Sequence, residues 1–68
     1  MQNLKNNLKL YLIQAELTQE ELASIIGVSR ETILFIEKRK HVPSLSLAMK
    51  LAKRFEIKVD DLFYFEEE

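Results

Sequence analysis

The stretch from Gln19 to Lys38, QEELASIIGVSRETILFIEK, constrains the fold more than any other part of the chain. It holds two segments with helical apolar periodicity, each too short to be stable alone, and a turn at Gly27 joins them. Because the turn leaves no room for a flexible loop, the two predicted helices must cross at a fixed angle. The sequence therefore predicts a tightly coupled helix pair.

Residues at the ends of both segments support this interpretation. Ala23 is small where the second helix comes closest, and Gly27 follows four residues later, where the chain needs a positive φ. Thr18 and Glu21 form a T-x-x-E capping box for the first helix, and Ser29 is a natural N-cap for the second. This is the pattern of a helix-turn-helix.

Five collinear blocks of the chain resemble the Cro and phage-repressor type of DNA-binding domain, the XRE-like helix-turn-helix family. The resemblance implies an all-α fold like that of lambda repressor, a compact bundle of about five short helices. Periodicity and caps place four helices at residues 7–14, 19–25, 30–37 and 45–55, and a short fifth one opens at Asp60. The matching blocks are LTQEELA (17–23), IGVSRETI (26–33), IEK (36–38), VPSLSLAMKLAK (42–53) and VDDLF (59–63).

The length of 68 residues allows one domain with one small core. We therefore expect a single domain over residues 1–68, with the helix-turn-helix at 19–38 and a dimerisation element in the tail at 59–68. No apolar run is long enough to cross a membrane, and the N-terminus lacks the apolar segment of a signal peptide. We expect a cytoplasmic protein with no membrane contact.

The inventory of reactive residues argues against an enzyme. Cysteine is absent and His41 is the only imidazole, so no metal site and no cofactor are expected. One glycine cannot form a phosphate-binding loop. The adjacent carboxylates Asp60 and Asp61 open a predicted helix, as Glu20 and Glu21 open another, so they are capping residues. We expect no catalytic residues and no small-molecule substrate.

The net charge of −1 hides an uneven distribution. Residues 1–55 carry nine Lys and Arg against five Glu, a balance of +4, whereas residues 56–68 carry one Lys against six acids, a balance of −5. DNA responds to the local field within about 8–10 Å at ordinary salt. The acidic tail therefore does not exclude a nucleic-acid partner.

The outer face of the second helix of the motif, at residues 30–37, is the predicted DNA-reading surface. Ile33 and Ile36 point one way, so the opposite face is left for contact. By the resemblance, Arg30, Glu31 and Phe35 read bases, and Gln19 and Lys38 contact phosphate. The outer face adds Leu34 to the base-reading residues. The further expected phosphate contacts are Ser29, Thr32, Arg39 and Lys40. A basic run is usually a solvated loop, but KRKH directly follows the reading helix, where the same charges favour phosphate contact.

Three residues depart from the family pattern. Leu12 stands where an arginine commonly pairs with the acid at Glu37, so Glu37 is expected to turn to Arg30, Lys38, Lys40 or water. Glu16 replaces a common glycine, and we expect the chain to turn differently between the helix at 7–14 and the helix at 19–25. Arg39 replaces another, and the end of its helix is expected to lack a left-handed cap.

The chain has more apolar residues than a small core can hide. In the predicted helix at residues 7–14, apolar residues spread around the circumference: Leu8, Leu10, Tyr11, Leu12 and Ile13. The terminal segments could cover this surplus, or it could form a second buried face in a dimer. Alternation in the tail is too brief to establish a strand, although such pairing with the N-terminal arm occurs in some relatives. The expected dimer interface is Leu62, Phe63, Tyr64 and Phe65.

These observations predict a sequence-specific transcriptional regulator that binds double-stranded DNA. The motif needs two half-sites, which favours a homodimer on a pseudo-palindromic operator with the second helix of the motif in the major groove. The alternative is a helical protein-interaction or antitoxin-like module on the same fold, because Leu34 and Phe35 place apolar surface on the outer face.

Overall fold

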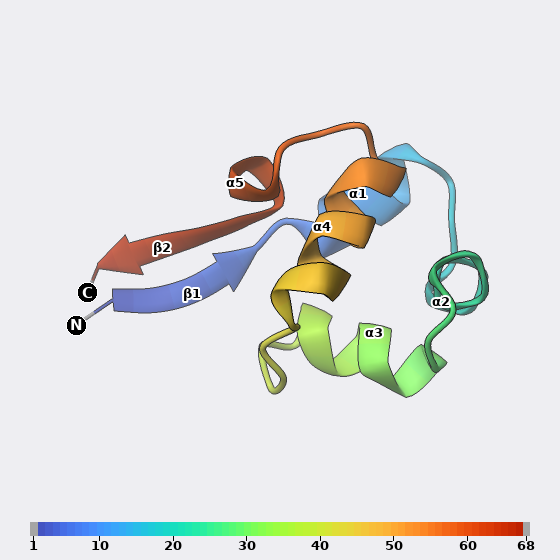
Figure 1. Cartoon of the computed structure of the whole chain (residues 1–68), viewed down its shortest axis with the longest axis horizontal. Coiled ribbons are helices and arrows are strands. Elements are labelled where there is room, and N and C mark those ends of the chain that lie inside the picture. Colours follow the sequence, from blue (N-terminus) through green and yellow to red (C-terminus); the bar gives the residue numbers. More distant parts are fainter. Residues whose placement is uncertain (1, 68) are drawn as a thin grey trace.

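The two ends of the chain pair with each other, and their sheet projects from one side of a bundle of short helices (Figure 1). The computed structural model describes residues 2–67, which form five helices and one two-stranded antiparallel sheet. Met1 and Glu68, the ends of the expected domain, lie outside the described residues. The predicted helical bundle is confirmed, and the terminal β-pairing that the sequence leaves open is present. In order, the elements are β1 (Gln2–Asn6), α1 (Leu8–Gln14), α2 (Gln19–Ile26), α3 (Arg30–Glu37), α4 (Leu45–Arg54), α5 (Val59–Leu62) and β2 (Phe63–Glu67).

Every helix contributes apolar side chains to a single core. Burying a side chain of the size of leucine contributes roughly 1.5–3 kcal/mol, so a few such residues dominate the stability of a small domain. The ring of Tyr11 on α1 also packs at a tilt against Phe55, with 5.7 Å between the ring centroids. The largest fully buried side chains are Leu8, Leu22, Ile33, Ile36, Leu51 and Leu62.

The starts of α2 and α3 are fixed by the residues that the sequence indicates. Thr18 and Glu21 form the expected reciprocal capping box on α2. The hydroxyl of Ser29 accepts a hydrogen bond from the backbone N–H of Thr32 on α3, and Ser44 caps α4 in the same way. Each cap satisfies a backbone donor that the helix itself cannot.

The helix ends repeat one turn geometry, although only one of them carries glycine. Glu16, Gly27, Arg39 and Glu56 follow the four longer helices and all have positive φ, between 55° and 89°. Beyond Arg39, the N–H of Lys40 donates to the carbonyl of Phe35 (2.8 Å), which is the signature bond of a Schellman turn. The expectation that Arg39 would abolish the left-handed cap is therefore wrong. The corner at Glu16 is likewise drawn as a glycine would draw it.

The sheet register places Leu4 opposite Phe65 and Asn6 opposite Phe63, so these four side chains share one face. On the other face, Lys5 forms an ion pair with Glu66 (3.7 Å). The longest of the described helices, α4, has ten residues, well below the roughly 20 that a bilayer crossing needs. None of the described helices is long and apolar enough to span a membrane.

Candidate nucleic-acid interface

The turn between α2 and α3 fixes how the two helices cross. Ala23 is buried, and its carbonyl accepts hydrogen bonds from the N–H groups of Gly27 (2.8 Å) and Val28 (3.0 Å). Gly27 has φ 89°, a conformation that glycine adopts at least cost. A Cβ added there would meet nothing within 4 Å, so the turn needs glycine for its backbone angle and not for space.

The start of α3 presents two hydroxyls that bond to each other. Ser29 Oγ lies 2.9 Å from Thr32 Oγ1 and also accepts the Thr32 N–H at 3.1 Å. Because one hydroxyl proton serves that contact, the other is free to donate outward. Both residues were predicted to contact phosphate, and the first turn of a helix is suited to an anion.

The outer face of α3 carries the predicted base-reading residues. Arg30 and Glu31 are exposed in the first turn, while Ile33 and Ile36 are buried on the opposite side. Leu34 is half-buried, and Phe35 remains 42% exposed. The arrangement thus brings two charged groups and one aromatic ring together on a convex helix face, with the apolar anchors beneath them.

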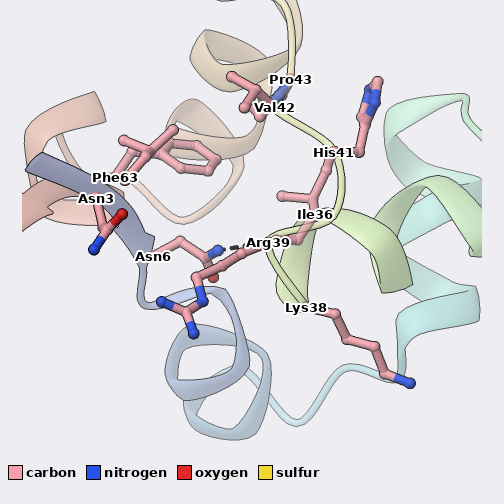
Figure 2. Close-up of a pocket in the computed structure, with 10 residues that line it drawn as sticks. Asn3, Asn6, Ile36, Lys38, Arg39, His41, Val42, Pro43 and Phe63 are labelled. Carbon is pink, nitrogen blue, oxygen red and sulfur yellow. Dashed lines mark hydrogen bonds between the residues drawn. The ribbon is translucent and has the colours of Figure 1, made fainter.

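The basic run continues from the end of α3. Lys38, Arg39, Lys40 and His41 are all exposed. Among the described residues the only ion pair joins Lys5 to Glu66, so the cationic groups of this run have no acidic partner there. In Figure 2 the side chains of Lys38 and His41 extend in different directions from the loop, while Arg39 extends toward β1. Uncompensated charge of this kind is what a phosphate backbone attracts.

Glu37 has a partner that sequence reasoning missed. Leu12 is buried and Glu37 is half-buried. Gln19 Nε2 donates to Glu37 Oε2 at 2.9 Å, so the carboxylate turns to neither Arg30, Lys38 nor Lys40. The bond joins the start of α2 to the end of α3. The signal that could have found it was the loss of the arginine combined with an amide at the first position of α2.

A cavity of about 360 Å³ lies between the sheet and the end of α3 (Figure 2). Its floor is apolar and includes Ile36 and Phe63, while its rim carries amide and cationic groups. No group of three or more His, Cys, Asp or Glu that could hold a metal occurs within the described part of the chain. The full lining is Asn3, Leu4, Asn6, Ile36, Lys38, Arg39, His41, Val42, Pro43 and Phe63.

The predicted dimer residues divide between core and surface. Leu62 is 0% exposed and belongs to the core, so it offers no surface to a partner and its assignment is corrected. Phe63 is half-buried against the cavity, whereas Tyr64 and Phe65 are exposed. On α1, Leu10 and Ile13 also stay exposed, because the described terminal segments leave them uncovered.

Electrostatics at the start of α2 follow from the capping box. The backbone N–H of Thr18 donates to Glu21 Oε1 at 2.9 Å, and the Thr18 hydroxyl accepts the Glu21 N–H at 3.0 Å. The hydrogen bond from the Thr18 backbone is the chief cause that lowers the pKa of the Glu21 carboxyl, and the Thr18 side chain adds to it. The charged form of Glu21 therefore holds the first turn of α2.

Comparison with known proteins agrees with this geometry. The helix-turn-helix family model HTH_3 matches residues 8–62. An uncharacterised HTH-type transcriptional regulator of Methanocaldococcus jannaschii is 52% identical over 65 residues, which are 96% of this chain and 98% of that protein. The HTH-type transcriptional regulator YgzD of Bacillus subtilis, also uncharacterised, is 43% identical over the same shares.

Two solved structures share the fold. A provisionally assigned DNA-binding protein from Bacteroides fragilis superposes with a TM-score of 0.80 at 28% identity, covering 90% of this chain and 98% of that one. The SOS-response transcriptional repressor LexA from Eubacterium rectale superposes with a TM-score of 0.76 at 36% identity, covering 81% of this chain and 58% of that one.

Proposed function

Because the chain belongs to the helix-turn-helix family of transcriptional regulators, which bind DNA and are not enzymes, we propose that it is a sequence-specific regulator of transcription. In this proposal α3 enters the major groove of double-stranded DNA. The observation that carries it is the exposed outer face of α3, followed directly by a basic run without acidic partners among the described residues. Such a regulator acts in the cytoplasm, where it meets the DNA.

The residues on the outer face have chemistry suited to base edges. Arg30 can donate two hydrogen bonds to guanine O6 and N7, and Glu31 can accept one from cytosine N4. Leu34 and Phe35 can pack on a thymine methyl group. All four lie within two turns of the helix, so together they would read a few successive base pairs.

A second set of residues would hold the phosphate backbone. Ser29 and Thr32 stand at the N-terminus of α3, where backbone N–H groups and hydroxyls favour an anion. Gln19 Nε2 has a second proton beyond the one given to Glu37, so its amide can hold both the carboxylate and a phosphate. The cationic side chains that would follow the backbone are Lys38, Arg39 and Lys40.

Recognition of an operator also needs a second copy of α3. We propose a homodimer through Phe63, Tyr64 and Phe65, which remain after Leu62 is assigned to the core. A two-fold dimer would place two copies of α3 about 34 Å apart on a pseudo-palindromic site. The exposed strand that carries these aromatic residues supports this choice of interface.

Selection of bound sequences from random duplexes by the purified protein tests the proposal. We expect an enriched site with two-fold symmetry and half-sites one helical turn apart, or a multiple of it. Binding should weaken steeply with salt, because each neutralised phosphate releases counterions. Recovery of no preferred sequence, together with salt-independent binding, would reject the proposal.

One observation favours a second candidate on the same fold. Phe35 is 42% exposed beside the half-buried Leu34, and an apolar pair on an outer helix face can also bind protein. In that case the chain is a protein-interaction or antitoxin-like module, and substitution of Phe35 would abolish capture of a protein while leaving duplex binding intact. The salt-dependent shift of duplex DNA separates the two functions.

A further inference from the structure

Asn6 connects three elements through its side chain. It is the last residue of β1, and its Oδ1 accepts a hydrogen bond from the N–H of Leu8, the first residue of α1, at 3.1 Å. Its Nδ2 donates to the carbonyl oxygen of Ile36 on α3 at 2.9 Å, drawn as a dashed line in Figure 2. Because the Leu8 N–H can only donate, the amide oxygen must face α1, and the amide nitrogen must face α3.

The acceptor of this bond lies inside the turn that ends α3. The Ile36 carbonyl also accepts the N–H of Arg39 at 2.9 Å, and Arg39 has φ 62°, an unfavourable value for a residue with a side chain. The neighbouring bond from Lys40 N–H to the Phe35 carbonyl completes the turn. Asn6 of the terminal sheet therefore donates to the same Ile36 carbonyl that accepts the Arg39 N–H in the turn where the basic run leaves α3.

We propose that Asn6 is a positioning residue through which the terminal sheet fixes the backbone turn from which the basic run of Lys38, Arg39 and Lys40 reaches the DNA phosphates. This inference rests on the proposed function, because it assigns a role to a contact behind the DNA surface. Asn6 itself is half-buried in the wall of the cavity and need not touch DNA.

The geometry separates this role from base reading. Arg30 lies at the other end of α3, about 9 Å along the axis from Ile36. Its turn is held independently by Ser29 and Thr32. Phe35 directly precedes Ile36, but it lies inside the helical span of α3, which ends at Glu37, whereas the basic run lies beyond that span. Loss of the Asn6 bond should therefore loosen phosphate contacts and leave the choice of sequence unchanged.

The chain offers a matched pair of variants. Asn6→Asp keeps the oxygen that accepts from Leu8 and loses the NH₂ that reaches Ile36. The control Asn7→Asp changes the charge equally and loses a comparable bond, from Asn7 Nδ2 to the Asp61 carbonyl (3.1 Å), which does not touch α3. Asn6→Ser adds no charge, keeps a hydroxyl that can accept the N–H two residues on, and is too short to bridge to α3, so it serves as the second variant.

Hydrogen exchange of the free protein is the first readout. In both Asn6 variants the amides of Arg39 and Lys40 should exchange roughly three- to tenfold faster, the factor expected for losing one neutral hydrogen bond. The amides of Glu56 and Ile57 form the same turn after α4 and should keep their rates, which provides a control inside the molecule. Equal acceleration at both turns would show a global loss of stability and would overturn the inference.

Duplex binding is the second readout. We expect both Asn6 variants to bind the selected and a scrambled duplex more weakly by the same factor, roughly three- to tenfold, and Asn7→Asp to match the wild type more closely. A change in the ratio of the two affinities, or no change in either, would overturn the inference. If the wild-type protein itself shows no salt-dependent binding, the proposed function fails, and the role of Asn6 fails with it even where hydrogen exchange shows the link.

Discussion

Three of the described residues that carry side chains occupy left-handed positions that usually belong to glycine. Each such position costs a non-glycine residue roughly 1–2 kcal/mol. Glu56 is the cleanest case, because it is exposed, has φ 57° and lies in none of the predicted contact sets. We predict that Glu56→Gly stabilises the protein by about 0.5–1 kcal/mol after the extra entropy of the unfolded glycine is counted. Chemical denaturation would measure the free energy of unfolding.

A glycine inside the preceding helix is the control for this substitution. Lys53 is also exposed but lies in the last turn of α4, where a change to glycine should cost up to about 1 kcal/mol. Opposite signs for the two substitutions support the assignment of strain to the backbone of Glu56. Destabilisation by both would contradict it.

The Gln19 and Glu37 side chains should be coupled energetically. Their hydrogen bond involves a charged acceptor and is only partly exposed, so a double-mutant cycle with alanine at both positions should give about 0.5–1.5 kcal/mol. Glu37→Gln should cost less than about 1 kcal/mol, because the new amide oxygen can still accept from Gln19. A control cycle in which Glu20, the exposed neighbour of Gln19, takes the place of Gln19 as the partner of Glu37 should show no coupling. Equal coupling in the two cycles would refute the assignment.

Residues that act locally were predictable, and those that act across the chain were not. Thr18, Ser29 and Ser44 cap helices within three residues of themselves, so the sequence specifies them. The Gln19 to Glu37 bond spans 18 residues and depends on how two helices cross. The turn at Arg39 was missed because propensity disfavours it and the packing of the whole turn outweighs that preference.

At the scale of elements, the stability of α2 depends on pH through the carboxyl group of Glu21. Folding lowers the pKa of Glu21, so the charged carboxylate stabilises the helix above the pKa of the unfolded chain, and this contribution is lost as pH falls through the lower folded value. We predict that the melting temperature of wild type exceeds that of Glu21→Gln near neutral pH and that the gap narrows below about pH 4. A gap that is independent of pH would disprove the role of the charge.

The element boundaries follow the sequence closely where caps and periodicity agree. The α3 span of Arg30–Glu37 equals the predicted one, and α1, α2 and α4 each differ from the predicted span by one residue at one end. The strands β1 and β2 could not be specified, because their pairing joins segments about 60 residues apart and neither has a decisive alternation. The sequence prediction assigned the whole tail to the dimer interface, but the structure divides it: Leu62 completes the core, whereas Phe65 stays 65% exposed.

At the scale of the whole molecule, exposed aromatic surface on β2 supports self-association. We predict a dimer in light scattering at micromolar concentration. Phe65→Ser should weaken the association at least tenfold, because burying an aromatic ring in the interface contributes roughly 1.5 kcal/mol or more. Ile25→Ser removes an exposed apolar side chain from α2 and should leave association unchanged. A wild-type mass of one chain, 8.0 kDa, would eliminate the dimer.

The most direct test of DNA recognition is the binding of Arg30→Ala and Lys40→Ala to the selected duplex and to a scrambled one at several salt concentrations. Arg30→Ala should cost about 1–3 kcal/mol on the selected site and reduce the ratio of specific to non-specific affinity. Lys40→Ala should weaken both duplexes alike and lower the salt slope by about one. If Arg30→Ala leaves the affinity ratio unchanged, the outer face of α3 does not read sequence, and the account is contradicted.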